Sequence, residues 1–314
     1  MLSYFNPIQT ENGLTLSVDR LVIDYYVGSP LKREAFSAFI FRLPLHYNVD
    51  TQLWDAFKPG TYHSNAIIKL NDGNSFYIGM GLNAAKTEWE KIRIEFNPNK
   101  VGYHSVLLRI LRWLNGATQP MHRSIRRFDI AMDIPVDRND VTLIKDRRLY
   151  TSRKHGSEFT EYLGAKSSTI GRTKLYNKQT EAGLAYPLTR LEITLDPTTP
   201  FEKQPWPKVY YIDNYQCQLD DFKRLTDTQR FILGALLSGY GSIKDLGRRE
   251  QERIRPFLEQ YIKYVAVAKK EYMKILQQLR LYVTSPYKLV RRDDVYDDTV
   301  PVHEPLPYYQ SFSR

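Results

Sequence analysis

The chain contains almost no cysteine and no long apolar segment. Its single cysteine, Cys217, excludes an internal disulfide framework and indicates a reducing, cytoplasmic setting. No apolar run is long enough to span a bilayer, so no membrane partner is expected. Asn6, Gln9 and Glu11 interrupt the apolar residues near the N-terminus, and a secretory signal peptide is therefore not expected either.

Several well-known site motifs are missing as well. There is no G-x-x-x-x-G-K-[ST] loop to cradle nucleotide phosphates, and a single cysteine cannot form a zinc cluster. None of the six histidines lies two positions from another, so the His-x-His metal site of one large class of nicking enzymes is absent. A mobilisation relaxase of that class is accordingly disfavoured.

Positive charge and aromatic rings are abundant. A net charge of +10 and a pI of about 9.4 favour an anionic partner such as nucleic acid. The 23 tyrosines and 14 phenylalanines suit stacking against single-stranded bases. They suit an ordinary β-rich core equally well, and composition leaves both interpretations open.

Two patterns predict β-strands in the first part of the chain. Residues 17–26 are rich in β-branched and aromatic residues, and residues 91–97 alternate between apolar and polar, with a hairpin between the two around Asn71-Asp-Gly-Asn74. Helical spacing predicts helices over residues 31–43, directly after Pro30, and over 105–114. The first part therefore combines strands with at least two helices.

A second set of strands repeats this arrangement. Strands are predicted at 127–133 and 190–195, with a hairpin over about 158–178 between them. Two short matches support a repeat: Tyr162-Leu-Gly164 with Tyr77-Ile-Gly79, and Leu191-Glu-Ile-Thr-Leu-Asp-Pro197 with Ile94-Glu-Phe-Asn-Pro98. We predict an α+β fold with a largely antiparallel sheet, built from a duplicated strand–hairpin–strand unit or from strands alike by chance. Packed helices and a helical C-terminal region complete it.

Four segments follow from these patterns. Residues 1–13 are predicted to be a flexible N-terminus, 14–223 a β-rich domain, 224–283 a helical basic region and 284–314 a flexible tail. Part of the helical region, 257–283, is periodic and carries four lysines that are candidates for DNA binding: Lys263, Lys269, Lys270 and Lys274. Such a segment is either an amphipathic helix packed on the protein or a basic helix in a DNA groove.

The stretch from Arg172 to Lys178 carries a pattern that suits phosphodiester chemistry. In a strand, Arg172, Lys174, Tyr176 and Lys178 share one face of the sheet. A phenol attacks only when its phenolate form is favoured, and the two lysines are expected to lower its pKa. The planar guanidinium group of arginine suits phosphate oxygens. Four cations are candidates to grip the scissile phosphate: Arg172, Lys174, Lys178 and, on another strand, Arg190. The alternative is a surface strand of alternating lysine and tyrosine.

Carboxylates lie on the two strands predicted beside this one. Asp129, Asp133 and Glu192 face the same way as Tyr176 if the strands are neighbours. Oxygen ligands suit Mg²⁺ or Mn²⁺, and Asp129 with Glu192 is the favoured pair. Cross-strand ion pairs between these acids and arginines are the structural alternative.

Taken together, these motifs resemble the Rep_trans family of rolling-circle replication initiators from small Gram-positive plasmids of the staphylococcal type. The resemblance rests on Tyr162-Leu-Gly164, Ser167-Ser168, Arg172-Thr-Lys-Leu-Tyr176-Asn-Lys178-Gln-Thr-Glu181 and Arg190-Leu-Glu192. Earlier strands contribute Asp19-Arg-Leu21, Ile94-Glu-Phe-Asn-Pro98 and Arg127-Phe-Asp129-Ile-Ala-Met-Asp133. It covers roughly residues 17 to 280 and leaves both ends unmatched.

The resemblance implies a DNA endonuclease and strand transferase. By motif, Tyr176 would attack a phosphodiester at the plasmid origin, keep the 5′ end as a phosphotyrosine and release a free 3′-OH primer. It also implies a divalent cation, Mg²⁺ or Mn²⁺, binding of duplex and extruded-hairpin origin DNA, a homodimer, and recruitment of a host helicase. A non-catalytic DNA-binding regulator is the main alternative. A tyrosine recombinase is less favoured, because its nucleophile normally lies near the C-terminal end.

Overall fold

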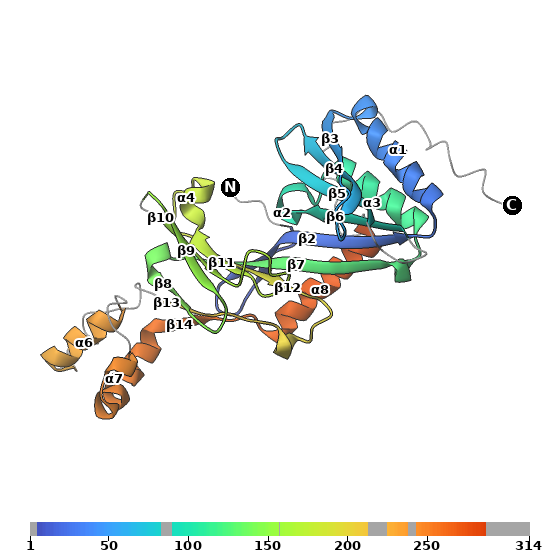
Figure 1. Cartoon of the computed structure of the whole chain (residues 1–314). Coiled ribbons are helices and arrows are strands. Elements are labelled where there is room, and N and C mark those ends of the chain that lie inside the picture. Colours follow the sequence, from blue (N-terminus) through green and yellow to red (C-terminus); the bar gives the residue numbers. More distant parts are fainter. Residues whose placement is uncertain (1–4, 83–89, 157, 213–224, 238–242, 287–314) are drawn as a thin grey trace. The chain divides into compact units, whose positions relative to one another are not determined.

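The computed structural model describes residues 5–82, 90–156, 158–212, 225–237 and 243–286 (Figure 1). These residues form two compact units. Unit 1 is drawn from Met1–Asp19 and Arg127–Leu276, and unit 2 from Arg20–Arg126 and the residues from Gln277 onward. Each unit is built around its own set of antiparallel strands.

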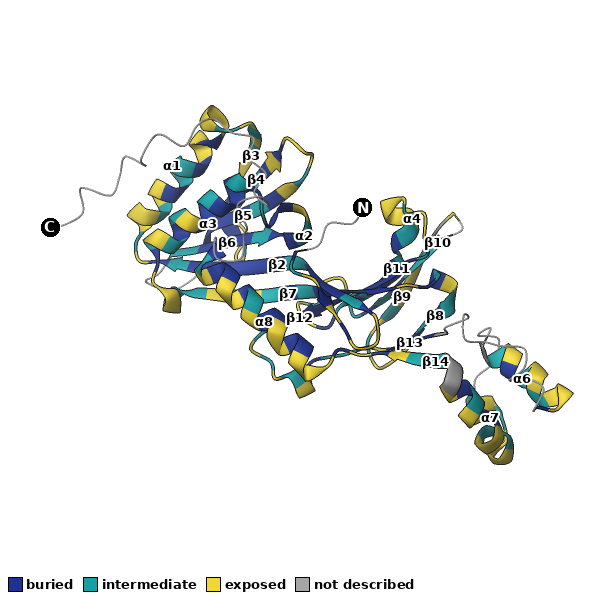
Figure 2. Cartoon of the chain, turned by 180° about the vertical axis from the view of Figure 1, so that it is seen from behind, coloured by how far each residue is buried: buried dark blue, intermediate teal, exposed yellow. Residues whose placement is uncertain are grey.

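Unit 2 has the strand order β3-β4-β5-β6-β2. These strands are β3 (Val49–Asp55), β4 (Tyr62–Leu70), β5 (Ser75–Leu82), β6 (Glu90–Phe96) and β2 (Thr15–Val27), of which the residues from Arg20 belong to this unit. Helix α1 (Pro30–His46) packs on β3, β5 and β6, and α3 (Ser105–Ala117) follows the short helix α2 (Pro98–Val101). The helices turn buried residues inward and exposed ones outward (Figure 2).

The sequence explains these elements locally. Ile92, Ile94 and Phe96 alternate along β6 and are buried, while the residues between them face the other side of the sheet. Ser29 caps α1 by accepting a hydrogen bond from the backbone N–H of Lys32, with proline in the first turn. The alternation that predicts a strand therefore also fixes which sheet face is the core.

Unit 1 has the strand order β9-β10-β11-β12-β7. Its strands are β9 (Tyr150–His155), β10 (Glu158–Leu163), β11 (Thr173–Asn177), β12 (Thr189–Leu195) and β7 (Arg123–Ile134), with the short helix α4 (Lys178–Ala182) joining β11 to β12. Strand β1 (Ile8–Gln9) pairs with the start of β2. Phe128, Ile130, Leu191 and Ile193 fill the core side, which leaves their polar neighbours on the opposite face.

A smaller sheet and two more helices complete unit 1. The sheet has the order β14-β13-β8, formed by β14 (Ile262–Val265), β13 (Lys208–Ile212) and β8 (Val141–Ile144). Helices α6 (Asp227–Leu237) and α7 (Arg248–Tyr261) bury Leu233, Ile254 and Leu258 against each other. The long helix α8 (Lys269–Thr284) follows β14.

The α+β fold with a largely antiparallel arrangement is confirmed, and the strand orders support the predicted duplication. Each unit has a meander of four consecutive strands, β3 to β6 in unit 2 and β9 to β12 in unit 1. The strand that precedes the meander in the chain pairs with its last strand, so β2 corresponds to β7 and β6 to β12. The match of Ile94–Pro98 with Leu191–Pro197 lies on corresponding strands. The other match does not, because Tyr77 lies on the third strand of its meander and Tyr162 on the second of the other.

Two expectations about the chain's course differ from the structure. The periodic segment 257–283 is not one helix, because β14 interrupts it before α8 begins. The compact units follow the repeat rather than a boundary at residue 223, although the predicted domain limits themselves remain a prediction. The predicted C-terminal tail lies outside the described residues after Pro286. Within the described ranges, no helix has the length and apolar character needed to cross a membrane.

Candidate active site

Tyr176 and Glu192 face each other on neighbouring strands of unit 1. In the β11–β12 register, Lys174 is opposite Glu192 and Tyr176 is opposite Arg190, so all four side chains share the face away from the core. The Tyr176 hydroxyl donates a hydrogen bond to Glu192 Oε1 over 2.7 Å. The predicted neighbourhood of β7, β12 and β11 is confirmed, and it places the phenol beside a carboxylate.

The environment of Tyr176 holds the phenol in its neutral form. The side chain is 6% exposed, and burial raises its pKa well above the ordinary value, with the nearby Glu192 carboxylate raising it further. The sequence predicts the opposite direction, from an exposed tyrosine among lysines. That prediction is wrong because the strand face is partly covered, and desolvation outweighs the attraction of neighbouring cations.

The two lysines flanking Tyr176 have different surroundings. Lys174 places its ammonium 3.6 Å from the centroid of the Tyr176 ring, a close cation–π contact. Lys178 does not continue the strand; it begins α4, is buried and pairs with Glu181. Asn177 caps that short helix by accepting from the Thr180 N–H, which ends the alternation one residue early.

Arg190 is occupied by carboxylates within unit 1. Its guanidinium group donates to both oxygens of Asp133, over 2.6 and 2.8 Å, and lies 3.5 Å from Asp19. Arg190 and Asp133 are both 3% exposed, so this is a buried ion pair. Asp133 therefore forms a cross-strand ion pair, the alternative to metal binding that the sequence left open. Because Arg190 donates to Asp133, it has few N–H groups left for a phosphate.

Glu192 lies in a setting that disfavours its charge. Burial raises its pKa to about 7, and the second cause is the like charge of Asp19 on β2. Asp129 faces Thr194 in the β7–β12 register, two residues along from the position opposite Glu192. The described residues contain no ready-made group of three or more His, Cys, Asp or Glu side chains that would hold a metal.

A divalent cation nevertheless fits the donor chemistry of this site. Mg²⁺ is commonly bound by one or two carboxylates, with water and substrate phosphate completing its shell. Glu192 and Asp19 supply two carboxylates, and the charge of Asp19 helps to raise the pKa of Glu192, a repulsion that a cation would relieve. Asp19 was not among the predicted ligands, although the motif Asp19-Arg-Leu21 in the family resemblance was a signal for it.

The basic residues predicted to contact DNA are spread over two elements. Lys263 lies on β14, and Lys269, Lys270 and Lys274 lie on α8. Lys269 pairs with Glu202 over 2.6 Å, and Lys270 pairs with Glu11. Both pairs are exposed, so DNA could displace them at little cost.

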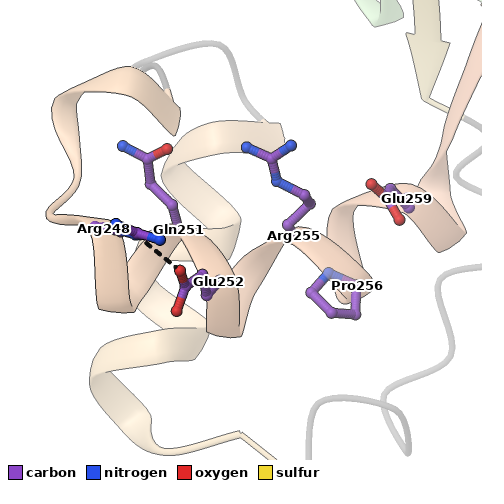
Figure 3. Close-up of a pocket in the computed structure, with 6 residues that line it drawn as sticks. All are labelled: Arg248, Gln251, Glu252, Arg255, Pro256 and Glu259. Carbon is purple, nitrogen blue, oxygen red and sulfur yellow. Dashed lines mark hydrogen bonds and ion pairs between the residues drawn. The ribbon is translucent and has the colours of Figure 1, made fainter.

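Helix α7 carries four exposed arginines that the sequence prediction missed. They are Arg248, Arg249, Arg253 and Arg255, and they flank the buried Ile254 on both sides of the helix. An open hollow runs along this helix, and Figure 3 shows Gln251 and Arg255 projecting from it, with Arg248 bonded to Glu252. The density of arginine between 248 and 255 was the available signal. None of the candidate catalytic residues lines this hollow.

Unit 2 contains the corresponding framework without a counterpart of Tyr176. Arg93 donates to both oxygens of Asp24, over 2.7 and 2.8 Å, as Arg190 does to Asp133 in unit 1. The residue opposite Arg93 on β5 is Gly79, where unit 1 has Tyr176. A Cβ at Gly79 would come within 2.6 Å of the Tyr62 ring, so a side chain has no room there.

The carboxylate that corresponds to Glu192 is also engaged differently. Glu95, two residues after Arg93, pairs with Arg20, whereas Glu192 accepts from Tyr176. Arg20 occupies the position that Asp129 has in unit 1, four residues before the buried aspartate. Among the residues that the structure describes, the repeat in unit 1 has this arrangement of phenol, carboxylate and second acid, and the repeat in unit 2 does not.

Comparisons with solved structures add a structural likeness. The chain is similar to a solved structure titled as a rolling circle replication initiator protein from Geobacillus stearothermophilus, with 18% sequence identity and a TM-score of 0.35. The likeness covers 59% of this chain and 75% of that one. Neither a protein-family model nor a curated protein sequence matches the chain.

Proposed function

We propose that this protein cuts and rejoins one strand of DNA through a covalent bond to Tyr176. The observation that carries the proposal is the hydrogen bond from the Tyr176 hydroxyl to Glu192, on a sheet face that also holds Lys174 and Arg172. The motif resemblance to rolling-circle initiators supports a plasmid origin as the substrate and a 5′-phosphotyrosine as the intermediate. Rejoining needs no nucleotide hydrolysis, because the tyrosyl ester retains the energy of the broken bond.

Glu192 is the group placed to take the phenolic proton. Its Oε1 already accepts the hydrogen that must leave before the oxygen attacks phosphorus. Transfer from an ordinary phenol to a carboxyl with a pKa of about 7 costs about 4 kcal/mol, and burial of Tyr176 adds to that cost. In the free protein Tyr176 therefore stays protonated. Cleavage requires positive charge near the phenol, which Lys174 and a divalent cation would supply when DNA is bound.

Lys174 supplies part of that charge. Its ammonium lies over the Tyr176 ring, and Glu192 is opposite it across the strands. A phosphate at this face would draw the ammonium toward its oxygens and uncover the ring below. Lys174 then stabilises charge on the phosphate while Tyr176 attacks it.

Asp19 and Glu192 are the residues that would hold a divalent cation, with Asp129 the next nearest candidate. Bound there, Mg²⁺ or Mn²⁺ would polarise the scissile phosphate as a Lewis acid. Asp133 is assigned instead to holding Arg190, since both of its oxygens accept from that guanidinium group. Arg190 in turn fixes Asp19 beside Glu192.

Duplex DNA is proposed to bind on the helical part of unit 1. The exposed arginines of α7 suit base edges in a groove, because a guanidinium group can donate twice to guanine. Lys263, Lys269, Lys270 and Lys274 remain candidates for contacts to the DNA backbone, which are independent of sequence. The homodimer and the host helicase stay proposals that follow from the motif resemblance.

The proposal is tested by nicking a supercoiled plasmid that carries the candidate origin, with Mg²⁺ or Mn²⁺ present. Wild-type protein should convert it to the open circle, and Tyr176→Phe should not, while binding the same DNA with similar affinity. Lys178→Ala is the matched control, since Lys178 lies close in sequence but is engaged with Glu181. A Tyr176→Phe protein that still nicks would refute the assignment. Binding without nicking by the wild type would favour a DNA-binding regulator.

A further inference from the structure

Arginines of the unit 1 sheet differ in what their guanidinium groups contact. Arg138 and Arg190 donate their N–H groups to buried carboxylates. Arg153 on β9 and Arg172, directly before β11, instead lie over the ring of Tyr162 on β10, with 6.0 and 5.4 Å between Cζ and the ring centroid. Arg138 and Arg190 therefore stabilise the fold through ion pairs, whereas Arg153 and Arg172 contact an aromatic ring.

Stacking on a ring leaves the binding edge of a guanidinium group available. A cation–π contact uses the flat face of the group, whereas its N–H donors point outward in the plane. Those donors match the oxygens of a phosphate, which they can bind in pairs. Among the described side chains, no carboxylate forms an ion pair with Arg153 or Arg172.

This cluster lies directly beside the candidate nucleophile. Tyr162 is opposite Lys174 in the β10–β11 register, and Lys174 covers the ring of Tyr176. Residues directly opposite in neighbouring strands share a sheet face, so Tyr162 and Tyr176 lie on the same face one strand apart. Arg153 is exposed on β9, the strand at the end of this order, and Arg172 is half-buried nearer the site.

We propose that Arg153 and Arg172, held apart and oriented by Tyr162, form a clamp for phosphates of unpaired DNA next to the scissile phosphate. The inference rests on the proposed function, because it takes its ligand from the DNA cut by Tyr176. Two guanidinium groups fixed by one ring lose less side-chain freedom on binding than two free arginines would. A single strand suits the site, since its backbone can follow the flat sheet from β11 toward β9.

The test measures binding of a fluorescent single-stranded oligonucleotide to full-length Tyr176→Phe protein, which cannot react, at several salt concentrations. Arg153→Ala and Arg172→Ala should each weaken binding by about tenfold, as expected for loss of a charge-assisted hydrogen bond. Each should also reduce the slope of log affinity against log salt by about 0.7, the loss of one phosphate contact to a single strand.

Lys154→Ala is the matched control for charge. Lys154 is exposed on the same strand as Arg153 but points to the opposite sheet face, so its loss should change affinity by less than about twofold. Tyr162 is tested by keeping or removing its ring. Tyr162→Phe should bind as the parent does, whereas Tyr162→Leu should lose as much as an arginine variant and add little to Arg153→Ala.

Three results would overturn the clamp. These are equal losses for Lys154→Ala and Arg153→Ala, parental binding by Tyr162→Leu in a variant of unchanged melting temperature, and no single-strand binding at all. The proposed function is judged separately, by the covalent adduct of protein carrying the native Tyr176. If the arginine variants form the adduct as well as the parent and bind the oligonucleotide with unchanged affinity, the clamp is refuted and the nicking proposal stands. If binding depends on the two arginines but no adduct forms, the nicking proposal is refuted and the clamp stands.

Discussion

The hydrogen bond between Tyr176 and Glu192 joins two residues that sequence periodicity could place on one sheet face. Their roles could not be read from the same pattern, because the direction of a pKa shift depends on burial. Alternation along a strand says which side a residue faces, not what covers that side. Tyr176 is accordingly buried and neutral, where the sequence predicts an exposed phenol of lowered pKa.

The raised pKa of Glu192 makes stability depend on pH. The folded protein binds this proton more tightly than the unfolded chain, with a pKa of about 7 against 4.5. Its contribution is therefore fully present below about pH 4.5 and is lost as the pH rises through 7. Without added metal, Glu192→Gln should match the wild type at low pH and exceed its unfolding free energy by up to about 3 kcal/mol at pH 8.

Urea unfolding of both proteins across this pH range checks the prediction. A constant difference between them at every pH would contradict the raised pKa. The same variant should fail to nick, since its amide cannot accept the phenolic proton.

Substitution of Asp133 distinguishes a structural role in the ion pair with Arg190 from a role as a metal ligand. Replacing it by asparagine leaves the buried Arg190 without its main partner, which should cost about 3 kcal/mol or more of unfolding free energy. Asp50→Asn is the control, because Asp50 and Lys69 form an exposed pair worth about 0–1 kcal/mol. If Asp133→Asn kept its stability but lost affinity for Mn²⁺, Asp133 would be a ligand after all.

Among the elements, those with strong local patterns were predictable from sequence. Strands β6, β7 and β12 contain alternating segments, β2 is rich in β-branched and aromatic residues, and α1 and α3 carry helical spacing, so the sequence predicts each of them close to its observed place. Strand β9 is a run of polar residues at the end of the strand order, which lacks an alternating apolar face. Strand β14 pairs with β13 about fifty residues earlier, a contact that no local pattern contains.

Helices α7 and α8 are expected to contribute differently to duplex binding. Combined alanine substitution of Arg249, Arg253 and Arg255 should weaken binding to the origin more than to unrelated duplex, because base-edge contacts are lost. Substitution of the three α8 lysines, Lys269, Lys270 and Lys274, should weaken both duplexes alike and reduce the salt slope. Titrations of each duplex at two salt concentrations separate the outcomes. Equal discrimination by the α7 variant and the wild type would contradict the assignment of α7.

Across the described residues, one framework occurs in both units, and we propose that the copy in unit 1 carries the chemistry. The repeated strand order and the two buried arginine–aspartate pairs belong to both units. The weak sequence matches suggested this repeat but aligned one pair of tyrosines wrongly, because short motifs do not reveal register. Register decides that Gly79, rather than Tyr77, stands where Tyr176 does.

The tyrosines of unit 2 should therefore be dispensable for cleavage. Tyr62→Phe and Tyr77→Phe should nick plasmid at rates within about twofold of the wild type, a difference of less than about 0.5 kcal/mol in the barrier. Tyr77→Phe loses its hydrogen bond to Asn65, so its stability is measured alongside. Loss of nicking in either folded variant would mean that unit 2 takes part in the chemistry.

The most direct test of the account is to identify the residue that becomes linked to DNA. Wild-type protein is incubated with Mg²⁺ or Mn²⁺ and origin-bearing DNA, denatured and digested with protease, and the peptide on the DNA end is sequenced by mass spectrometry. The account predicts a 5′-linked peptide that contains Tyr176. A 3′-linked peptide, or one attached through any other residue, would contradict it.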